Sequence, residues 1–131
     1  MAFKCSLVTP DANLFDDSAT GVILPGADGQ VGILTGHSPL LMKVGAGLLT
    51  IHQSGKPDTV YFVDGGVAQM KDDVLTILTD RAVEPSKIDV ESARKDLSEL
   101  EQFEVMNDAQ AATRDRKLRR AQAMLRAAGA V

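Results

Sequence analysis

A Gly-His-Ser-Pro segment contains the residues of this chain whose types could do chemistry. His37 and Ser38 are adjacent, and together with Asp64 they would supply the base, the nucleophile and the carboxylate of a hydrolase. In α/β-hydrolases the nucleophilic serine stands in a strand-to-helix elbow, and neither this elbow nor another local signature surrounds Ser38. The residues therefore favour a loop histidine that caps a turn or contacts a partner, and they predict no catalytic residue.

The sequence gives little support for a metal-binding site or a phosphate-binding loop. The two histidines, His37 and His52, and the single cysteine, Cys5, do not have the spacing of a zinc site. The glycine-rich segment at residues 26–29 lacks the Gly-Lys-Ser/Thr ending of a phosphate-binding loop and reads as a β-turn. A single cysteine also excludes an internal disulfide, so Cys5 is expected to be a small core residue in a reducing compartment. We predict no metal site.

The cationic residues gather near one end of the sequence, although the formal net charge of the whole chain is −4. Residues 1–111 contain eight Lys and Arg against seventeen Asp and Glu, a net charge of −9. Residues 112–131 contain six against one, a net charge of +5. Five of these six cations form a basic run: Arg114, Arg116, Lys117, Arg119 and Arg120. An acidic body with a basic tail indicates that the tail meets an acidic surface.

That acidic surface could belong to a protein, a nucleic acid, an anionic lipid or the chain's own body, and a basic run is often only a solvated helix face. Nucleic-acid binding calls for aromatic residues or a known motif nearby, and the tail has neither. Membrane binding calls for a broad apolar helix face, which is also missing. Docking on an acidic protein surface is the functional interpretation that remains.

Up to about residue 83, the segments that must position these residues are predicted to be short strands. Phe3, Cys5 and Leu7 alternate with polar residues, which is typical of a half-buried strand. Turn signals recur every eight to ten residues, and Gly45-Ala46-Gly47 reads as one of these turns. The predicted strands span residues 3–7, 13–19, 21–25, 31–34, 40–44, 48–52, 60–63, 67–70, 74–78 and 81–83. This pattern indicates a β-sandwich or a small barrel and argues against a Rossmann-like fold.

From residue 84 onwards the apolar period becomes helical. Pro85 and Ser86 mark the start of a helix, which Ser86 or Asp89 could cap. Its apolar stripe consists of Ala93, Leu97, Leu100 and Phe103. Asn107-Asp108 then offers a new N-cap for a second helix at residues 109–128, which Gly129 would end.

The second helix has a thin apolar face that consists largely of alanine: Ala111, Leu118, Ala121, Leu125 and Ala128. Two helices joined by a short connection form an αα-hairpin. Because alanine methyl groups bury little area, this hairpin is expected to be marginally stable and able to undock, as a switch would. The sequence thus divides into a β domain at residues 1–84 and a helical hairpin at residues 88–131.

The order of several motifs resembles the epsilon subunit of F-type ATP synthases over essentially the whole chain. The resemblance is centred on residues 32–41, Gly-Ile-Leu-Thr-Gly-His-Ser-Pro-Leu-Leu, although Thr35 stands where the family usually has proline. Further similar segments are the glycine-led strand at 45–51, the Gly-Gly break at 63–67 and the strand at 74–82. The resemblance implies a mainly β fold, a ten-stranded β-sandwich followed by a C-terminal αα-hairpin.

The resemblance also implies a function and partners. It implies a non-catalytic rotor subunit on the central stalk, against the gamma subunit and the ring of c subunits, which couples rotation to ATP synthesis. Such a subunit is peripheral at the cytoplasmic face of the energy-transducing membrane and is held there only through the complex. The loop residues Gly36, His37 and Ser38 are then expected to face the c ring, with Gln30 in the neighbouring turn.

In this family the C-terminal helices can extend beside gamma into the alpha/beta head and block ATP hydrolysis. There the basic second helix meets acidic residues of the beta subunits. By resemblance, the basic run from Arg114 to Arg120 is expected to supply that contact here. The rival interpretation from the residues alone is a free β-sandwich adaptor whose basic hairpin docks on an acidic protein partner.

Some members of the family bind ATP on the folded hairpin, through an Ile/Leu-Asp-x-x-Arg-Ala motif and arginines of the second helix. This chain reads Ile-Asp-Val-Glu-Ser-Ala from residue 88, so Asp89 matches the motif but Ser92 replaces its arginine. Arg120 matches one arginine of the second helix, whereas Met124 stands at the other. The resemblance therefore predicts an ATP site at Asp89 and Arg120 that is weak or absent, and no other cofactor.

Overall fold

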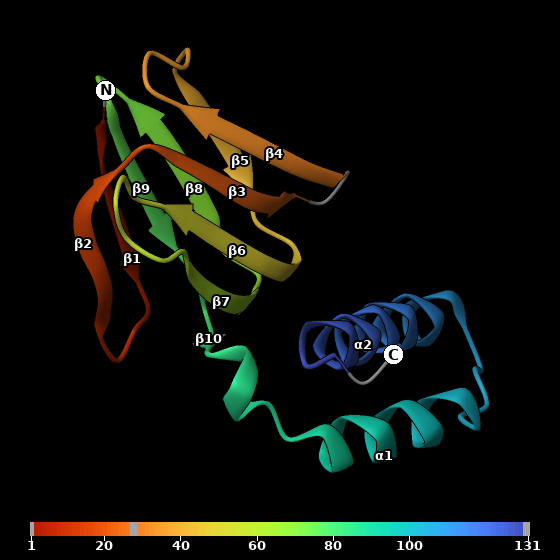
Figure 1. Ribbon diagram of the computed structural model, residues 1–131. Coiled ribbons are helices and arrows are strands. Elements are labelled where there is room, and N and C mark those ends of the chain that lie inside the picture. The colour runs from red at the N-terminus through yellow and green to blue at the C-terminus, as the bar shows by residue number, and fades with distance from the viewer. Residues whose placement is uncertain (1, 27–28, 130–131) are drawn as a thin grey trace. The chain divides into compact units, whose positions relative to one another are not determined.

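Strands come first along the chain and helices follow in the computed structural model, which describes residues 2–26 and 29–129 (Figure 1). The strands are β1 Phe3–Val8, β2 Asn13–Ala19, β3 Gly21–Gly26, β4 Gly29–Leu34, β5 Leu40–Lys43, β6 Ala46–His52, β7 Thr59–Asp64, β8 Val67–Lys71, β9 Val74–Leu78 and β10 Ala82–Val83. The helices are a 3-10 turn at Pro85–Lys87, α1 at Val90–Glu101 and α2 at Asp108–Ala127. The chain separates into two compact units, Met1–Glu84 and Pro85–Val131.

The strands form two five-stranded sheets. Sheet A has the order β2-β1-β9-β8-β5, and sheet B has the order β10-β7-β6-β3-β4. Strand β1 pairs in parallel with β9, whereas the other paired strands run antiparallel. Side chains from both sheets meet in one buried cluster, so the sheets are the two layers of a sandwich. The structure confirms the mainly β fold class and decides for the sandwich over the barrel.

Alternate residues of the strands build the core. In β1, Phe3, Cys5 and Leu7 point inwards and are buried, as their alternation with polar residues predicts. Burial of the Cys5 thiol, with a smaller contribution from the negative charge of Asp16, raises its pKa to about 12. Cys5 is therefore a neutral core side chain at physiological pH.

The segment Gly45-Ala46-Gly47 is not the turn that the sequence predicted, because β6 begins at Ala46. Its glycines serve close packing instead. A Cβ atom on Gly47 would lie 2.9 Å from the Cβ of Pro25, and one on Gly45 would lie 3.1 Å from the carbonyl oxygen of Gly26. Glycine at a close approach and glycine in a turn look alike in sequence. The turn predicted at residues 26–29 includes residues 27 and 28, which lie outside the described residues.

Both helices begin at a capping side chain. Asp89, rather than Ser86, caps α1, because its Oδ1 accepts a hydrogen bond of 3.0 Å from the Ser92 N–H. Asn107 caps α2 as predicted and accepts a hydrogen bond of 2.9 Å from the Gln110 N–H. The two helices pack against each other as an αα-hairpin.

The apolar stripe of the hairpin is thin, and it ends earlier than predicted. The buried helical residues on the stripe are Ala93, Ala121 and Leu125, and Ala123 is buried on another side of α2. Phe103 does not continue the stripe, because α1 ends at Glu101 and the Phe103 side chain is 50% exposed. The N–H of Gln102 bonds back to the Ser98 and Leu100 carbonyl oxygens, so the helix closes before Phe103 is reached.

Candidate interaction surfaces

The loop between β4 and β5 crosses from sheet B to sheet A and is held at two points. The His37 N–H donates a hydrogen bond of 3.1 Å to the Leu34 carbonyl oxygen, closing a turn in which Gly36 has φ +81°. The Gly36 N–H donates to Oδ1 of Asp73, at 3.0 Å, in the turn between β8 and β9. The loop is therefore fastened to the neighbouring turn as well as closed on itself.

This anchored loop presents His37 and Ser38 to solvent. Nδ1 of His37 lies 2.7 Å from the Ser38 carbonyl oxygen; since a carbonyl only accepts, Nδ1 donates, and Nε2 of the neutral ring is left to accept. Asp64 is not part of this arrangement. It pairs with Ala46 at one end of sheet B, whereas Leu34, beside the loop, pairs with Gly21 at the other end. The structure thus does not bring His37, Ser38 and Asp64 together.

Gln30 does not lie beside this loop, which corrects the expectation of neighbouring turns. It pairs with Pro25 near the beginning of β4, while the loop leaves the other end of that strand. At roughly 3.3 Å per residue, the extended strand separates Gln30 from Leu34, where the loop begins, by about 13 Å. The two positions can therefore contact different partners, but they do not form one patch.

The outer face of sheet A carries exposed apolar side chains that the sequence analysis missed, in rows that also contain the polar residues Gln69 and Thr76. Its most exposed apolar side chains are Leu41 at 71%, Leu78 at 53%, Val67 at 41% and Val74 at 39%. The pairing register aligns them across neighbouring strands, with Val67 opposite Leu78 and Leu41 in the adjacent row. Three exposed lysines share the face: Lys4, Lys43 and Lys71. Such a face fits a partner that is apolar with acidic groups around it.

A signal for this face was present in the sequence. Strand β9 reads Val-Leu-Thr-Ile-Leu, and apolar residues at both parities of a strand indicate that both of its faces are covered. Of these, Leu75 and Ile77 face the core, which leaves Val74 and Leu78 for the outer side. The sequence of β9 alone does not indicate which of these two alternating sets of residues faces the core.

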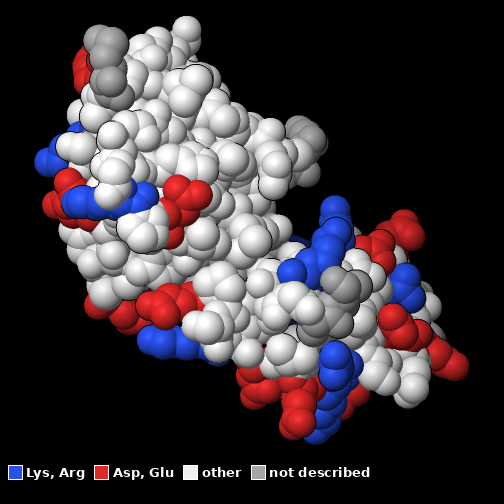
Figure 2. Space-filling view, viewed as in Figure 1, with Lys and Arg blue, Asp and Glu red and all other residues white. Residues whose placement is uncertain are grey.

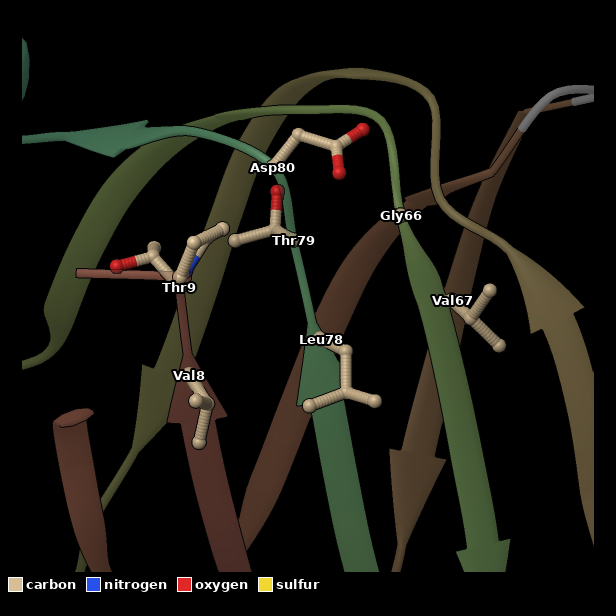
Figure 3. Close-up of a pocket in the computed structure, with 8 residues that line it drawn as sticks. Val8, Thr9, Gly66, Val67, Leu78, Thr79 and Asp80 are labelled. Atoms are coloured by element: carbon tan, nitrogen blue, oxygen red, sulfur yellow. The ribbon is translucent and has the colours of Figure 1, made fainter. Parts of the chain in front are cut away.

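A shallow pocket of about 360 Å³ lies at one end of this face, where β1, β9 and β8 run side by side (Figure 3). Val8, Val67 and Leu78 line its apolar side, and Asp80 lies at its rim. Thr79 is buried, and its Oγ1 lies 2.7 Å from the Gly65 carbonyl oxygen and 3.1 Å from that of Arg81. Hydrogen bonds of the buried Thr79 thus hold one side of this shallow pocket, and Val8, Val67 and Leu78 supply its apolar lining.

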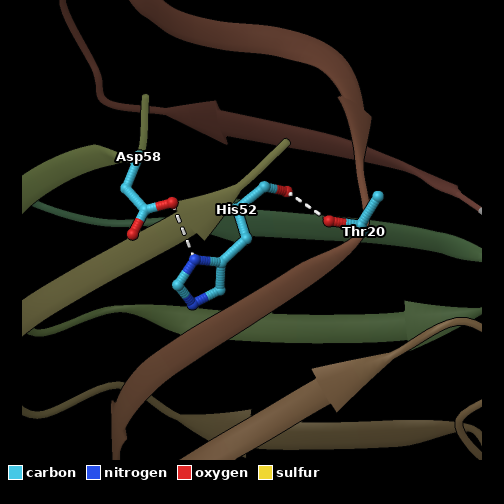
Figure 4. A network of polar contacts seen from close by, with 3 residues as sticks. All are labelled: Thr20, His52 and Asp58. Atoms are coloured by element: carbon cyan, nitrogen blue, oxygen red, sulfur yellow. Dashed lines mark hydrogen bonds and ion pairs between the residues drawn. The ribbon is translucent and has the colours of Figure 1, made fainter. Parts of the chain in front are cut away.

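His52, the last residue of β6, takes part in a network of polar contacts with Thr20 and Asp58 (Figure 4). Its Nδ1 lies 2.8 Å from Oδ1 of Asp58, and its carbonyl oxygen accepts a hydrogen bond of 3.1 Å from the Thr20 hydroxyl. Both His52 and Asp58 are well exposed, so the pair contributes little to stability. The contacts tie the connection between β6 and β7 to the start of β3. Within residues 2–26 and 29–129, no group of three or more His, Cys, Asp or Glu is placed to hold a metal ion.

The basic run of α2 is divided between two helix faces. Arg114 lies four residues before Leu118 and seven before Ala121, on the apolar stripe, and its side chain is only 32% exposed. Arg116, Lys117 and Arg119 are exposed, and Arg120 is half-buried. Figure 2 shows charged side chains of both signs over the helical unit. Four of the five predicted cations thus share a broad face, and Arg114 belongs elsewhere.

In the structure, the residues at the predicted weak or absent ATP site either cap a helix or lie half-buried on one. Asp89 uses its carboxylate to cap α1, and the Ser92 that replaces the motif arginine donates the N–H to that cap. Met124 is half-buried on α2, as is Arg120. Oδ1 of Asp89 is thus engaged with a backbone N–H at the start of α1.

Neither helix in the described part of the chain has the length and apolarity needed to cross a bilayer.

Comparison with known proteins assigns residues 2–85 to the ATP synthase delta/epsilon chain β-sandwich domain. An ATP synthase epsilon chain of Rhodopirellula baltica is 38% identical over 97% of this chain and 98% of its own length. A chloroplastic ATP synthase epsilon chain of Gracilaria tenuistipitata is 36% identical over 98% of this chain and 96% of its own length.

Two solved assemblies contain chains of the same fold. One is the Euglena gracilis mitochondrial ATP synthase, in which the similar chain has a TM-score of 0.85 at 22% identity, over 96% of this chain and 81% of that chain. The other is the central stalk and c ring of the Tetrahymena thermophila mitochondrial ATP synthase, with a TM-score of 0.69 at 14% identity, over 95% of each chain.

Proposed function

This chain belongs to the family of ATP synthase epsilon chains, and on that premise we propose that it is a non-catalytic central-stalk subunit of a proton- or ion-translocating F-type ATP synthase. As a rotor subunit it helps to couple rotation to ATP synthesis. The observation that carries the proposal is the group of exposed apolar side chains on the outer face of sheet A, which gives the sandwich a surface for a protein contact.

The gamma subunit is the proposed partner of this face. Leu41, Val67 and Leu78 offer apolar area that a free monomer would keep in water, and the pocket beside Val8 offers a socket. The three lysines around them are matched by acidic residues on the partner, which select the correct register. Burial of this face stabilises the complex mainly through the hydrophobic effect.

The c ring is the proposed partner of the end of the sandwich that carries the loop with Gly36, His37 and Ser38. The loop with Gly36, His37 and Ser38 and the Gln30 position lie at opposite ends of β4, so they serve separate contacts. His37 and Ser38 on their anchored loop offer polar groups at a fixed position, which costs little conformational entropy on binding. The subunit is peripheral, at the cytoplasmic face of the energy-transducing membrane, through these contacts.

A direct test is recovery of the complex by a tag on this chain from detergent-solubilised membranes. The unmodified chain is expected to recover gamma and c subunits, and the double variant Leu41→Glu/Leu78→Glu is expected to recover at least tenfold less of both. Gln122→Glu, at an exposed position of α2, adds the same kind of charge elsewhere and should leave recovery unchanged. Recovery of the chain alone or with unrelated proteins would favour the free adaptor instead.

The helical hairpin is proposed to inhibit ATP hydrolysis by entering the alpha/beta head. Its exposed cations Arg116, Lys117 and Arg119 match an acidic surface there, and its small apolar stripe makes undocking easy. Deletion of residues 88–131 is expected to raise ATP hydrolysis by the assembled enzyme. Unchanged hydrolysis would refute the inhibitory role and leave the rotor role standing.

We expect ATP to bind the hairpin weakly or not at all, because Ser92 and Met124 stand where the family's ATP-binding members have arginine. Isothermal titration of the isolated chain with millimolar ATP is expected to show no saturable heat. A micromolar site would contradict this, and the variant Asp89→Ala would then test whether the capping carboxylate takes part.

A further inference from the structure

The connection between α1 and α2 leaves two large apolar side chains in solvent. Phe103 is 50% exposed and Met106 is 79% exposed. Phe103 directly follows Gln102, the C-cap of α1, and Met106 directly precedes Asn107, the N-cap of α2. Both side chains therefore lie at the same end of the hairpin, three residues apart.

The backbone that carries these side chains is held in place. Oε1 of Gln110 accepts a hydrogen bond of 2.9 Å from the Met106 N–H, while the Gln110 N–H donates to Asn107. A residue at this position before an N-cap often packs against the residue four positions after the cap, which is Ala111 here. Alanine is too short for that contact, so the Met106 side chain stays exposed, on a backbone that the hydrogen bond to Gln110 holds.

The charges around this connection all have one sign. Between residues 96 and 113 every charged residue is acidic and exposed: Asp96, Glu99, Glu101, Glu104 and Asp108. The basic run begins only at Arg114. The hairpin is therefore acidic where its helices are joined and basic further along α2. We call Phe103, Met106 and these five carboxylates the acidic tip.

We propose that the acidic tip is an interaction surface for a protein partner with an apolar socket bordered by lysine and arginine. Aromatic and methionine side chains surrounded by polar groups are the usual centre and rim of a protein interface. Anionic bilayers and nucleic acids carry the same sign of charge as the tip and are repelled by it. The surface is separate from the basic run and faces the opposite kind of partner, and it does not depend on the rotor role.

The test uses a photoreactive phenylalanine analogue in place of Phe103 in the full chain, expressed in its native cells. Irradiation is expected to join the chain to one protein, at a peptide whose charged residues are mainly Lys and Arg. The same analogue at Gln122, an exposed position on α2 away from the tip, should not give that product. Adding Met106→Ser, or Glu101→Lys with Glu104→Lys, should lower the yield at least fivefold.

Each variant is first compared with the unmodified chain by circular dichroism, and only variants that keep its helical content are used. The proposal is overturned by products with lipid, with a second copy of this chain or with an acidic peptide, and equally by the absence of any product. It is also overturned if the charge reversal leaves the yield unchanged. Recovery of gamma and c subunits is scored separately, so the rotor role can fail while this inference stands, and the reverse.

Discussion

At the ends of the sandwich, a glycine at a single position allows two backbone segments to lie in close contact. Gly66 has φ +120°, and a Cβ atom there would collide with the Leu78 carbonyl oxygen and lie 2.7 Å from the Cα of Thr79. The Gly-Gly motif that looked like a simple strand break is thus a point of close backbone contact between the start of β8 and the end of β9. Gly32, in β4, has no such neighbour within 4 Å.

Replacing Gly66 with alanine should therefore cost about 3 kcal/mol or more of unfolding free energy, from steric overlap and an unfavourable φ together. The matched change Gly32→Ala should alter the unfolding free energy by about 0.5 kcal/mol or less. Urea unfolding followed by circular dichroism measures both. Equal losses in the two variants would show that the close contact at Gly66 does not limit stability.

Because of Cys5, the sandwich is expected to lose stability as the pH becomes alkaline. The pKa of its thiol is about 12 in the folded chain, against an ordinary value of 9.0. Between these values the folded chain holds a proton that the unfolded chain releases, so stability is retained below pH 9 and falls as the pH rises above it.

The slope from this one thiol approaches about 1.4 kcal/mol per pH unit. Cys5→Ala removes the titrating group, so the stability advantage of the unmodified chain over this variant should shrink as the pH rises from 8 to 10. Urea unfolding of both proteins at each pH gives the difference and cancels the other titrating groups. A constant difference would mean that the thiol ionises as readily in the folded chain as in the unfolded one.

Local sequence signals predicted most of the strands and helices that are observed. The ten strands and two helices were located because turn residues, alternation and capping side chains act over a few neighbouring residues. These local signals could not predict which strands pair with each other. The separation of Gln30 from the His37 loop, and the exposure of the outer face of sheet A, both depend on which strands pair and in which register.

The N-cap of α2 is an element whose contribution can be measured. Asn107→Ala removes the acceptor for the Gln110 N–H and should destabilise α2 by about 1 kcal/mol. Gln122→Ala, in the middle of α2 and exposed, serves as the matched change and should not destabilise it. Hydrogen exchange of the α2 amides reports the loss, which should appear as faster exchange confined to the hairpin; unchanged protection would show that the cap is dispensable.

The β-sandwich and the helical hairpin differ in the size of the side chains that each buries. The sandwich buries large side chains between its sheets, among them Leu7, Ile33 and Leu75, whereas the helices bury three alanines and one leucine. Apolar area removed from water scales with the size of these side chains, so the sandwich has the larger stabilisation. The sequence predicted this contrast from composition, because alanine on a helix face is visible without knowing its partners.

Amide hydrogen exchange of the isolated chain should resolve the two units. We expect the amides of α1 and α2 to exchange at least tenfold faster than those of β1, β6 and β9, since the helices open without unfolding the sandwich. Exchange at equal rates throughout would mean that the chain opens only as one cooperative unit. That result would argue against a hairpin that can move by itself.

The parallel pairing of β1 with β9 has a consequence for how the protein is made. β1 can form its hairpin with β2 early, but its other edge needs β9, whose residues are 74–78. At about 5–20 residues per second, a ribosome takes several seconds to reach β9 after β1 has been made. Throughout that interval β1 offers an unsatisfied backbone edge to other nascent chains. Closing the sandwich therefore waits for β9, and β1, the first of these ten strands to be made, is among the last to be completed.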